Sequence, residues 1–189
     1  MAKVSVPSKD LKTFYTYAKP LTTILVTAVD DKGAPNIITL AWHTPISIEP
    51  PLYGISVGPK RYSHELIRNS GEFVVNYPSF DLLEKVHHCG SVSGRKEDKF
   101  RQTGLTPLPS EKVGAPGIAE CYLNIECRLV DGPSFGDHTW FVGEVVNIRA
   151  DDAFFDAGLL RPEGDPILYM GKDLYQSLKG KRAQMRQRK

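Results

Sequence analysis

Residues 118–149, IAECYLNIECRLVDGPSFGDHTWFVGEVVNIR, decide the fold. In the first part, Ile118 to Val130, apolar residues recur at every second position, which is the period of a β-strand. The last part, Thr139 to Arg149, is rich in Phe, Val and Ile and is also typical of a strand. The Asp-Gly and Gly-Asp pairs between the two parts are turn signals, so these long strands are predicted to pair with each other.

Shorter strands are predicted on both sides of this pair, each bounded by glycine, proline or a turn-forming dipeptide. They are Thr23 to Asp30, Asn36 to Ser47, Leu52 to Val57, Glu72 to Tyr77 and, near the end of the chain, Pro166 to Met170. An Asp-Lys-Gly turn at residues 31–33 predicts that the first two form a hairpin. In its second arm the bulky residues are predicted to share one face and the small or polar ones the other.

Helical segments are brief in comparison. Short helices are predicted from Ser63 to Asn69, from Phe80 to His88 and around Asp152 to Leu160, with one more inside the polar segment Gly90 to Gly104. Strands joined by short turns, with only brief helical inserts, predict a mainly β closed antiparallel barrel rather than an alternating parallel α/β sheet.

Well-known catalytic and nucleotide-binding motifs are absent from the sequence. No GxGxxG follows a predicted strand and no GxxxxGK[ST] occurs, so neither a Rossmann nor a P-loop site is supported. The chain also contains no GxSxG, HExxH or DFG-like set. Any chemistry must therefore come from a more distributed pattern.

Composition places the chain among ordinary globular proteins. Its 189 residues contain 41% hydrophobic and 24% charged residues, which excludes a largely disordered chain, a collagen-like repeat and a disulfide scaffold. We expect one domain over residues 1–178. Residues 179–189 carry six Lys or Arg and no acid, so the net charge of +2 becomes −4 without them. We expect this basic tail to be solvated and mobile; a weak contact with nucleic acid or an anionic surface is the alternative.

The compartment is predicted from what the chain lacks. No stretch approaches the about 18 apolar residues of a membrane span, and the start of the chain has no apolar signal core. The three cysteines, Cys89, Cys121 and Cys127, form no CxxC pair and suit a reducing compartment, so we expect a cytoplasmic protein without a membrane partner. Two histidines precede Cys89 at a helix end, where contact with helix carbonyls is commoner than metal binding, and no metal site is expected.

The segment Ser56 to His64 joins a predicted strand to the start of a helix and has the chemistry of an anion site. A helix N-terminus offers free N–H groups, Arg61 offers a forked donor, and Ser63 can cap the helix or donate a hydrogen bond. Ordinary helix capping with Lys60 and Arg61 in solvent is the alternative interpretation.

Two other stretches are also compatible with a bound phosphate-bearing ligand. Residues 89–95 (CGSVSGR), followed by Lys99, offer small residues, hydroxyls and cations, although a flexible polar loop has the same composition. The small, polar face of residues 39–44 leaves room for a flat ring against exposed backbone, with ordinary barrel packing as the alternative. His138 lies in the turn before a long strand, where it can reach over a barrel mouth or remain an exposed turn residue.

Six segments, taken together and in order, resemble the flavin reductase-like, FMN-binding split-barrel family, especially its flavoredoxin and archaeal ferric reductase-like branch. They are VTAVDDKGAPNIITLAWHTPIS (26–47), PPLYGISVGPKRYSHELI (50–67), GEFVVNYP (71–78), CGSVSGRKEDKF (89–100), APGIAECYLNIEC (115–127) and GDHTWFVGEV (136–145). The resemblance extends from about Pro20 to Tyr175, and leaves the basic tail without a counterpart.

The resemblance implies a six-stranded antiparallel Greek-key split barrel with short flanking helices, assembled as a homodimer with FMN near the subunit interface. It implies that residues 39–44 border the flavin ring and that the two polar stretches hold the ribityl chain and phosphate. The cofactor-binding residues implied are Thr39, Ala41, Trp42, His43, Thr44, Ser56, Val57, Gly58, Arg61, Ser63, His64, Ser91, Ser93 and Lys99. His138 matches the histidine of the family's GDH turn and is implied to position nicotinamide.

The activity that the resemblance implies is hydride transfer from NADH or NADPH to bound FMN, with electrons passed on to a flavin, a ferric complex or a redox protein. The cofactor carries such chemistry, which agrees with the absence of a nucleophile or general-base motif. Two alternatives remain open: a flavoredoxin-like electron carrier with a protein redox partner, and a non-enzymatic flavin-binding barrel. No nucleic acid partner is expected.

Overall fold

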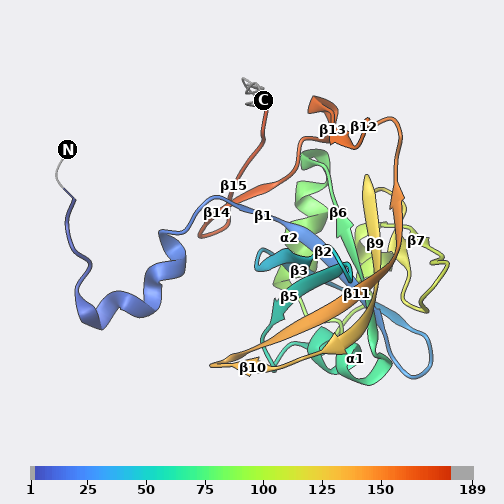
Figure 1. The fold of residues 1–189 in the computed structure, drawn as a ribbon, viewed down its shortest axis with the longest axis horizontal. Helices are drawn as coiled ribbons and strands as arrows, with labels where there is room; N and C mark the ends of the chain where they lie inside the picture. The colour runs from blue at the N-terminus through green and yellow to red at the C-terminus, as the bar shows by residue number, and fades with distance from the viewer. Residues whose placement is uncertain (1–2, 180–189) are drawn as a thin grey trace.

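The computed structural model describes residues 3–179 and contains one large curled antiparallel sheet (Figure 1). Its eight strands follow the order β3-β2-β6-β9-β11-β5-β4, with β10 paired to β11. Their bounds are β2 Ile24–Val29, β3 Pro35–Leu40, β4 His43–Ser47, β5 Leu52–Val57, β6 Glu72–Tyr77, β9 Leu123–Asp131, β10 Ser134–Phe135 and β11 His138–Ala150. The mainly β, antiparallel fold class is confirmed, although the sheet has more strands than expected.

The predicted pairing of the two long strands is confirmed, because β9 and β11 are antiparallel neighbours at the middle of the sheet. Between them Gly143 permits an unusually close approach: a Cβ there would lie 2.7 Å from both the Phe73 ring and Cys127 Cβ. Phe73, Cys127 and Phe141 are fully buried in the barrel core. The first long strand begins later than predicted, because residues 119–122 form a turn after the short strand β8, Gly117–Ile118.

One predicted strand, Asn36 to Ser47, is wrong as a single element. The chain leaves β3 after Leu40 and enters β4 at His43, and these two strands lie at opposite ends of the sheet order. Between them the Trp42 carbonyl accepts from the Ser56 N–H. The alternating sequence pattern therefore does not show that the chain passes from one edge of the sheet to the other. Among the described strands, β3 and β4 are not hydrogen-bonded neighbours, so the barrel is split between them.

Within residues 3–179, three helices flank the barrel: α1 Tyr62–Ser70, α2 Leu83–Ser91 and α3 Lys99–Thr103, with the 3₁₀ turns η2 Phe80–Leu82 and η3 Pro162–Gly164. The helix predicted at Ser63 to Asn69 is confirmed as α1, which ends at Gly71 with a left-handed φ of 70°. Leu66 and Ile67 of α1 pack into the barrel core, whereas Val86 of α2 joins a second cluster on the other face of β2 and β3.

A helix around Asp152 to Leu160 is not present. The segment forms the hairpin of β12, Phe155–Asp156, and β13, Leu159–Leu160. Its turn residues Ala157 and Gly158 both have positive φ, of 47° and 78°, which a right-handed helix does not allow. The predicted last strand corresponds to β14, Leu168–Gly171, within a small sheet that also contains β1, Leu21–Thr22, and β15, Leu174–Gln176. The remaining short strand, β7 Pro107–Leu108, pairs with β8.

The N-terminal arm, residues 3–17, extends away from the barrel (Figure 1). Its 3₁₀ helix η1, Ser8–Thr16, has no buried residue, and the Phe14 and Tyr17 side chains are exposed. The arm meets the body where the Tyr15 ring lies 5.9 Å from the Trp42 ring. At the other end, residues 180–189 of the basic tail lie outside the described residues. Among residues 3–179, none of the helices has the length and apolar character needed to cross a membrane.

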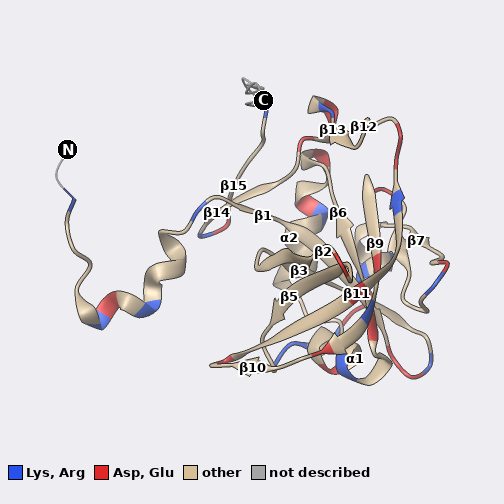
Figure 2. Cartoon of the chain, viewed as in Figure 1, with Lys and Arg blue, Asp and Glu red and all other residues tan. Residues whose placement is uncertain are grey.

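The strands β2, β3 and β5 contain no charged residue, whereas β6, β9 and β11 contain some (Figure 2). Glu126 on β9 is buried, with only 1% of its surface exposed. Its carboxylate accepts from the N–H groups of Glu111 and Lys112 and from Asn147 Nδ2, at 2.7–3.2 Å. Burial raises the pKa of Glu126, but these hydrogen bonds and the nearby Arg149 hold it below its usual value.

We expect Glu126→Gln to lower the free energy of unfolding by about 1–3 kcal/mol at pH 7, because the negative charge is lost and an amide NH₂ would face donors that one carboxylate oxygen now accepts from. The pKa of Glu126 is lowered in the folded state, so its contribution is present above the unfolded pKa of about 4.3 and is lost as pH falls through the folded pKa. Urea unfolding at pH 7 and at pH 3 should therefore show the difference from wild type narrowing in acid. The exposed Glu144→Gln is the control, and equal stability of Glu126→Gln and wild type at pH 7 would contradict the assignment.

Candidate functional site

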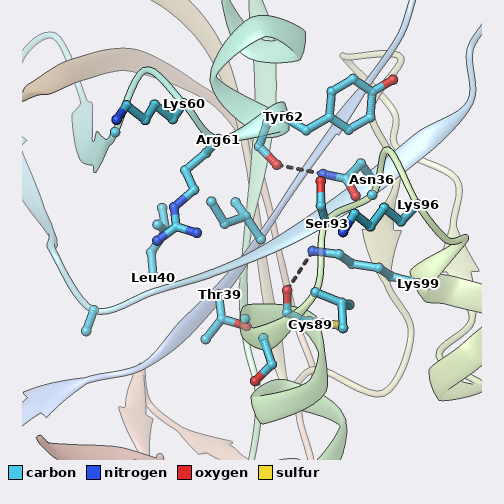
Figure 3. A pocket seen from close by; sticks show the side chains of 18 of the residues that line it. Asn36, Thr39, Leu40, Lys60, Arg61, Tyr62, Cys89, Ser93, Lys96 and Lys99 are labelled. Atoms are coloured by element: carbon cyan, nitrogen blue, oxygen red, sulfur yellow. Dashed lines mark hydrogen bonds between the residues drawn. The ribbon is translucent and has the colours of Figure 1, made fainter. Parts of the chain in front are cut away.

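A cleft of about 600 Å³ opens at the split edge of the barrel (Figure 3). Three junctions form its walls: the end of β3, the passage from β5 into α1, and the segment from the end of α2 to the start of α3. His138, the first residue of β11, completes the rim. The cleft therefore brings together segments that are far apart in the sequence.

Most of the residues proposed from the sequence line this cleft. They are Thr39, Ala41, Trp42, Ser56, Gly58, Arg61, Ser63, Ser91, Ser93, Lys99 and His138. Their convergence from four segments is a property of the fold and was not visible from the residue pattern alone.

Four of the proposed residues do not line the cleft. His43 is engaged elsewhere, with Nδ1 2.6 Å from the Tyr53 hydroxyl and Nε2 3.0 Å from the Thr22 carbonyl oxygen. Val57 is buried in the barrel core, and Thr44 is exposed on β4. His64 Nε2 pairs with a Thr139 hydroxyl at 2.8 Å. These side chains miss the cleft because they are buried in the barrel, bonded to other residues or directed to another face of their strand.

Other lining residues were not singled out from the sequence. Asn36 is buried at the start of β3 and donates from Nδ2 to Ser63 Oγ at 2.7 Å, which links β3 to α1. Gly94 packs directly against this amide and leaves no room for a Cβ. Beside the cleft, Arg95 of the predicted 89–95 stretch lies over the Tyr62 ring at 4.6 Å, and its guanidinium pairs with Glu65 of α1. Gly94 in the same stretch was the one available signal for the Asn36 contact, because close backbone approach favours glycine.

Lys99 is the most buried cation of the cleft, with 4% of its surface exposed. Its ammonium donates to the Ile37 carbonyl at 2.7 Å and to the Cys89 carbonyl at 2.6 Å. An ammonium has three N–H donors, so one remains after these two bonds. Burial lowers the pKa of Lys99; the nearby Cys89 and Glu97 raise it in part, and the positive charge of Arg61 has a smaller lowering effect. Two cations thus face one another across the cleft.

The charge of the cleft is strongly unbalanced. Figure 3 places Arg61 on one wall and Lys96 and Lys99 on the opposite wall, with their nitrogens directed inward. Lys60 adds a fourth cation, while Glu97 is the one acid of the lining, and it is paired with His88 at 2.6 Å. The start of α1 at Arg61 also has no side-chain cap, so its first N–H groups are open to a ligand. The arrangement is suited to an anion of high charge density.

His138 stands at the rim, close to Trp42. Their ring centroids are 5.0 Å apart, and His138 Nδ1 lies 2.8 Å from Asp137 Oδ1. The hydrogen bond from His138 lowers the pKa of Asp137. Nε2 lies on the side of Gly58, where an added Cβ would be 3.7 Å away. The ring is therefore held at one nitrogen, with the other turned to the cleft wall.

Comparisons with known proteins place the chain in a family. Residues 16–177 match the flavin reductase like domain. Flavoredoxin of Desulfovibrio vulgaris (Miyazaki F) is similar in structure, with a TM-score of 0.84 at 29% identity over 97% of both chains. An FMN-binding protein from Thermus thermophilus, solved with bound 1-cyclohex-2-enone, has a TM-score of 0.78 at 29% identity, covering 94% of this chain and 93% of its own.

A relative from Archaeoglobus fulgidus, an uncharacterized protein, is 44% identical over 140 residues, which are 74% of this chain and 78% of its own. The fold and these likenesses define a split-barrel protein of the flavin reductase-like class. This chain belongs to the flavin reductase-like family.

The tight contact between Gly94 and Asn36 supplies a test of how the cleft is held together. We expect Gly94→Ala to lower the free energy of unfolding by about 1–3 kcal/mol, because the new methyl group displaces the Asn36 amide and breaks its bond to Ser63. Chemical denaturation of Gly94→Ala, Asn36→Ala and the double variant measures the coupling. With Asn36 already truncated, the added methyl group should cost much less, whereas fully additive effects would contradict the contact.

Proposed function

We propose that this protein binds FMN in the cleft and acts as an NAD(P)H-dependent flavin or ferric reductase. The observation that carries the proposal is the convergence of Arg61 and Lys99 at the uncapped start of α1, beside the open end of β3. A phosphate dianion complements this pair of cations. The similarity to flavoredoxin and to an FMN-binding protein supports the same conclusion.

The residues present fit a flavin mononucleotide. The volume of about 600 Å³ lies within the range of about 300–1,000 Å³ that small-molecule sites occupy. The lining supplies cations for a single terminal phosphate, and residues 39–42 provide main-chain groups and the Trp42 ring for a flat heterocycle. Serine hydroxyls of the lining, from Ser56, Ser63 and Ser93, match a polyhydroxyl chain.

In this proposal each segment of the cleft has a separate task. Arg61, Lys99 and the α1 N-terminus hold the phosphate and fix the depth of the cofactor. The β3 end, from Thr39 to Ala41, borders the ring and supplies main-chain hydrogen bonds, and Trp42 limits the access of water. When bound, the flavin supplies the hydride-accepting and electron-transferring chemistry. The chain itself needs no nucleophile, and its role is to bind, orient and shield.

In this proposal, His138 contacts the second substrate. It stands at the cleft rim beside Trp42, with Nδ1 engaged by Asp137. A nicotinamide ring entering at this rim would meet the imidazole, which would orient it over the ring site. NADH and NADPH are both compatible with this role, and the acceptor is a flavin, a ferric complex or a redox protein.

The second candidate is a flavoredoxin-like electron carrier, which the structural likeness to flavoredoxin over 97% of both chains favours. The two functions differ in the reductant. Steady-state oxidation of NADH or NADPH supports the reductase, whereas reduction only by a protein donor supports the carrier. Very slow reduction by every donor would indicate a non-enzymatic flavin-binding barrel.

Two substitutions separate cofactor anchoring from hydride transfer. We expect Arg61→Ala to weaken FMN binding by roughly ten- to hundred-fold, because a charge-assisted bond to phosphate is lost. His138→Ala should retain the flavin and slow its reduction by NAD(P)H. Fluorescence titration with FMN and anaerobic stopped-flow bleaching of the flavin measure the two effects.

Arg101→Ala is the matched control, since this arginine is exposed on α3 and outside the cleft. Normal FMN affinity in Arg61→Ala would refute the phosphate assignment. Reduction of His138→Ala at the wild-type rate would refute the role of His138 in orienting nicotinamide.

We also propose that the protein is a cytoplasmic homodimer. The three cysteines are free and buried, which suits a reducing compartment. Val130 on β9 and Ile148 on β11 are 53% and 59% exposed, and the N-terminal arm adds exposed Leu11, Phe14 and Tyr17. Such exposed apolar groups are commonly covered by a subunit contact.

Light scattering should give a mass of about twice 21.0 kDa at micromolar concentration. We expect Ile148→Asp to shift the protein toward the monomer, because a carboxylate would enter an apolar contact. Leu174→Asp, on the separate small sheet, serves as the control. A wild-type mass of one chain, or a dimer indifferent to Ile148→Asp, would contradict the proposed contact.

A further inference from the structure

A second, smaller pocket of about 210 Å³ lies next to the cleft. The two cavities share a wall made of residues 39–41, Gly90 and Ser91. The small pocket has its own lining from other parts of the chain: Thr23, His87, Tyr169, Asp173 and Tyr175. These residues come from the start of β2, from α2 and from the β14–β15 hairpin, and none of them takes part in the proposed flavin site.

Thr23 gives this pocket an unsatisfied polar group. The residue is 2% exposed, and its Oγ1 is the one buried side-chain nitrogen or oxygen without a hydrogen-bond partner among the described residues. The main chain of Thr23 is fixed, since its N–H donates to the Ile167 carbonyl at 2.9 Å. A buried hydroxyl without a partner is destabilising, and it is expected where a ligand supplies the missing bond.

Aromatic groups form another part of the lining. The Tyr169 and Tyr175 rings are 5.4 Å apart, and the His87 ring lies 6.0 Å from Tyr175, nearly perpendicular to it. His87 Nδ1 is 3.4 Å from the Tyr175 hydroxyl. Such a wall favours a planar ring that stacks against it or meets it edge-on.

Charge and size narrow the ligand further. The lining contains no Lys or Arg, and the exposed Asp173 at the hairpin disfavours an anion. The Thr23 hydroxyl has no partner within residues 3–179 and can donate its O–H, so an acceptor oxygen on the ligand satisfies it. An apolar cavity of about 150 Å³ holds benzene, so about 210 Å³ admits one ring with a small substituent.

We propose that the small pocket is a separate binding site for a neutral single-ring aromatic carbonyl compound, whose carbonyl oxygen accepts a hydrogen bond from Thr23 Oγ1. The site is independent of the flavin, and the shared wall of residues 39–41 would place the two ligands side by side.

Acetophenone is the probe, with ethylbenzene as the analogue lacking the oxygen and benzoate as the charged analogue. Calorimetry on the full chain, with and without saturating FMN, should give measurable acetophenone binding and weaker binding of both analogues. Thr23→Val has the same shape without the hydroxyl and should weaken acetophenone binding about ten-fold. Thr22→Val, on the neighbouring residue outside both pockets, should leave the affinity unchanged.

Thermal unfolding checks the variant itself, because Thr23→Val removes an unsatisfied hydroxyl and should melt at or above the wild-type temperature. Three outcomes would overturn the proposal: no acetophenone binding by the wild type, equal affinity in wild type and Thr23→Val, or competitive displacement of acetophenone by FMN. Failure to bind FMN would refute the proposed flavin site only, because acetophenone binding tests the small pocket independently.

Discussion

The cleft depends on a buried ammonium. Lys99 joins the Ile37 carbonyl of β3 to the Cys89 carbonyl of α2, so one side chain fixes the distance between a strand and a helix that are more than forty residues apart in sequence. Burying this charge is unfavourable, as the lowered pKa of Lys99 indicates, and Arg61 adds a like charge nearby. An anion between such a pair of cations offsets their repulsion, which connects the packing of the barrel with the proposed binding of a phosphate.

Three further contacts join the walls of the cleft to one another. Asn36 bonds β3 to α1 through Ser63, and Gly94 lets the loop after α2 lie directly on that amide. Arg95 then spans from the loop to the Tyr62 ring. Each contact joins two of the three walls, so the shape of the cleft is set before any ligand arrives. Residues 39–41 separate it from the smaller pocket, and one strand end therefore serves two cavities.

The sequence predicts much of this structure where a local pattern corresponds to a local element. Strand alternation identifies β9, the Phe, Val and Ile content identifies β11, and the helix predicted from Ser63 to Asn69 corresponds to α1. The same patterns do not distinguish one strand from two when the chain changes sheet edge, as it does at Ala41 and Trp42. The helix expected around Asp152 to Leu160 was also wrong, because the positive φ of Ala157 and Gly158 allows a hairpin there instead.

Site residues were predictable where their chemistry is unusual, as for Arg61, Lys99 and the serines. Asn36 was missed because its role arises from a contact with α1, and His43 was included because it follows the lining strand although its ring is bonded to Tyr53. Both positions depend on contacts between residues in different elements of the fold, and such contacts leave no pattern in the local sequence. The family resemblance indicated which segments form the site, and the fold shows that these segments line one cleft.

The central claim is that the cations of the cleft hold a flavin phosphate, and the most direct measurement compares FMN with riboflavin. The two share the ring and ribityl chain and differ only in the phosphate. Fluorescence titration of the wild-type protein at low salt should give an affinity for FMN at least about a hundred-fold higher than for riboflavin, because two charge-assisted contacts are at stake. Equal affinities for FMN and riboflavin would contradict the account.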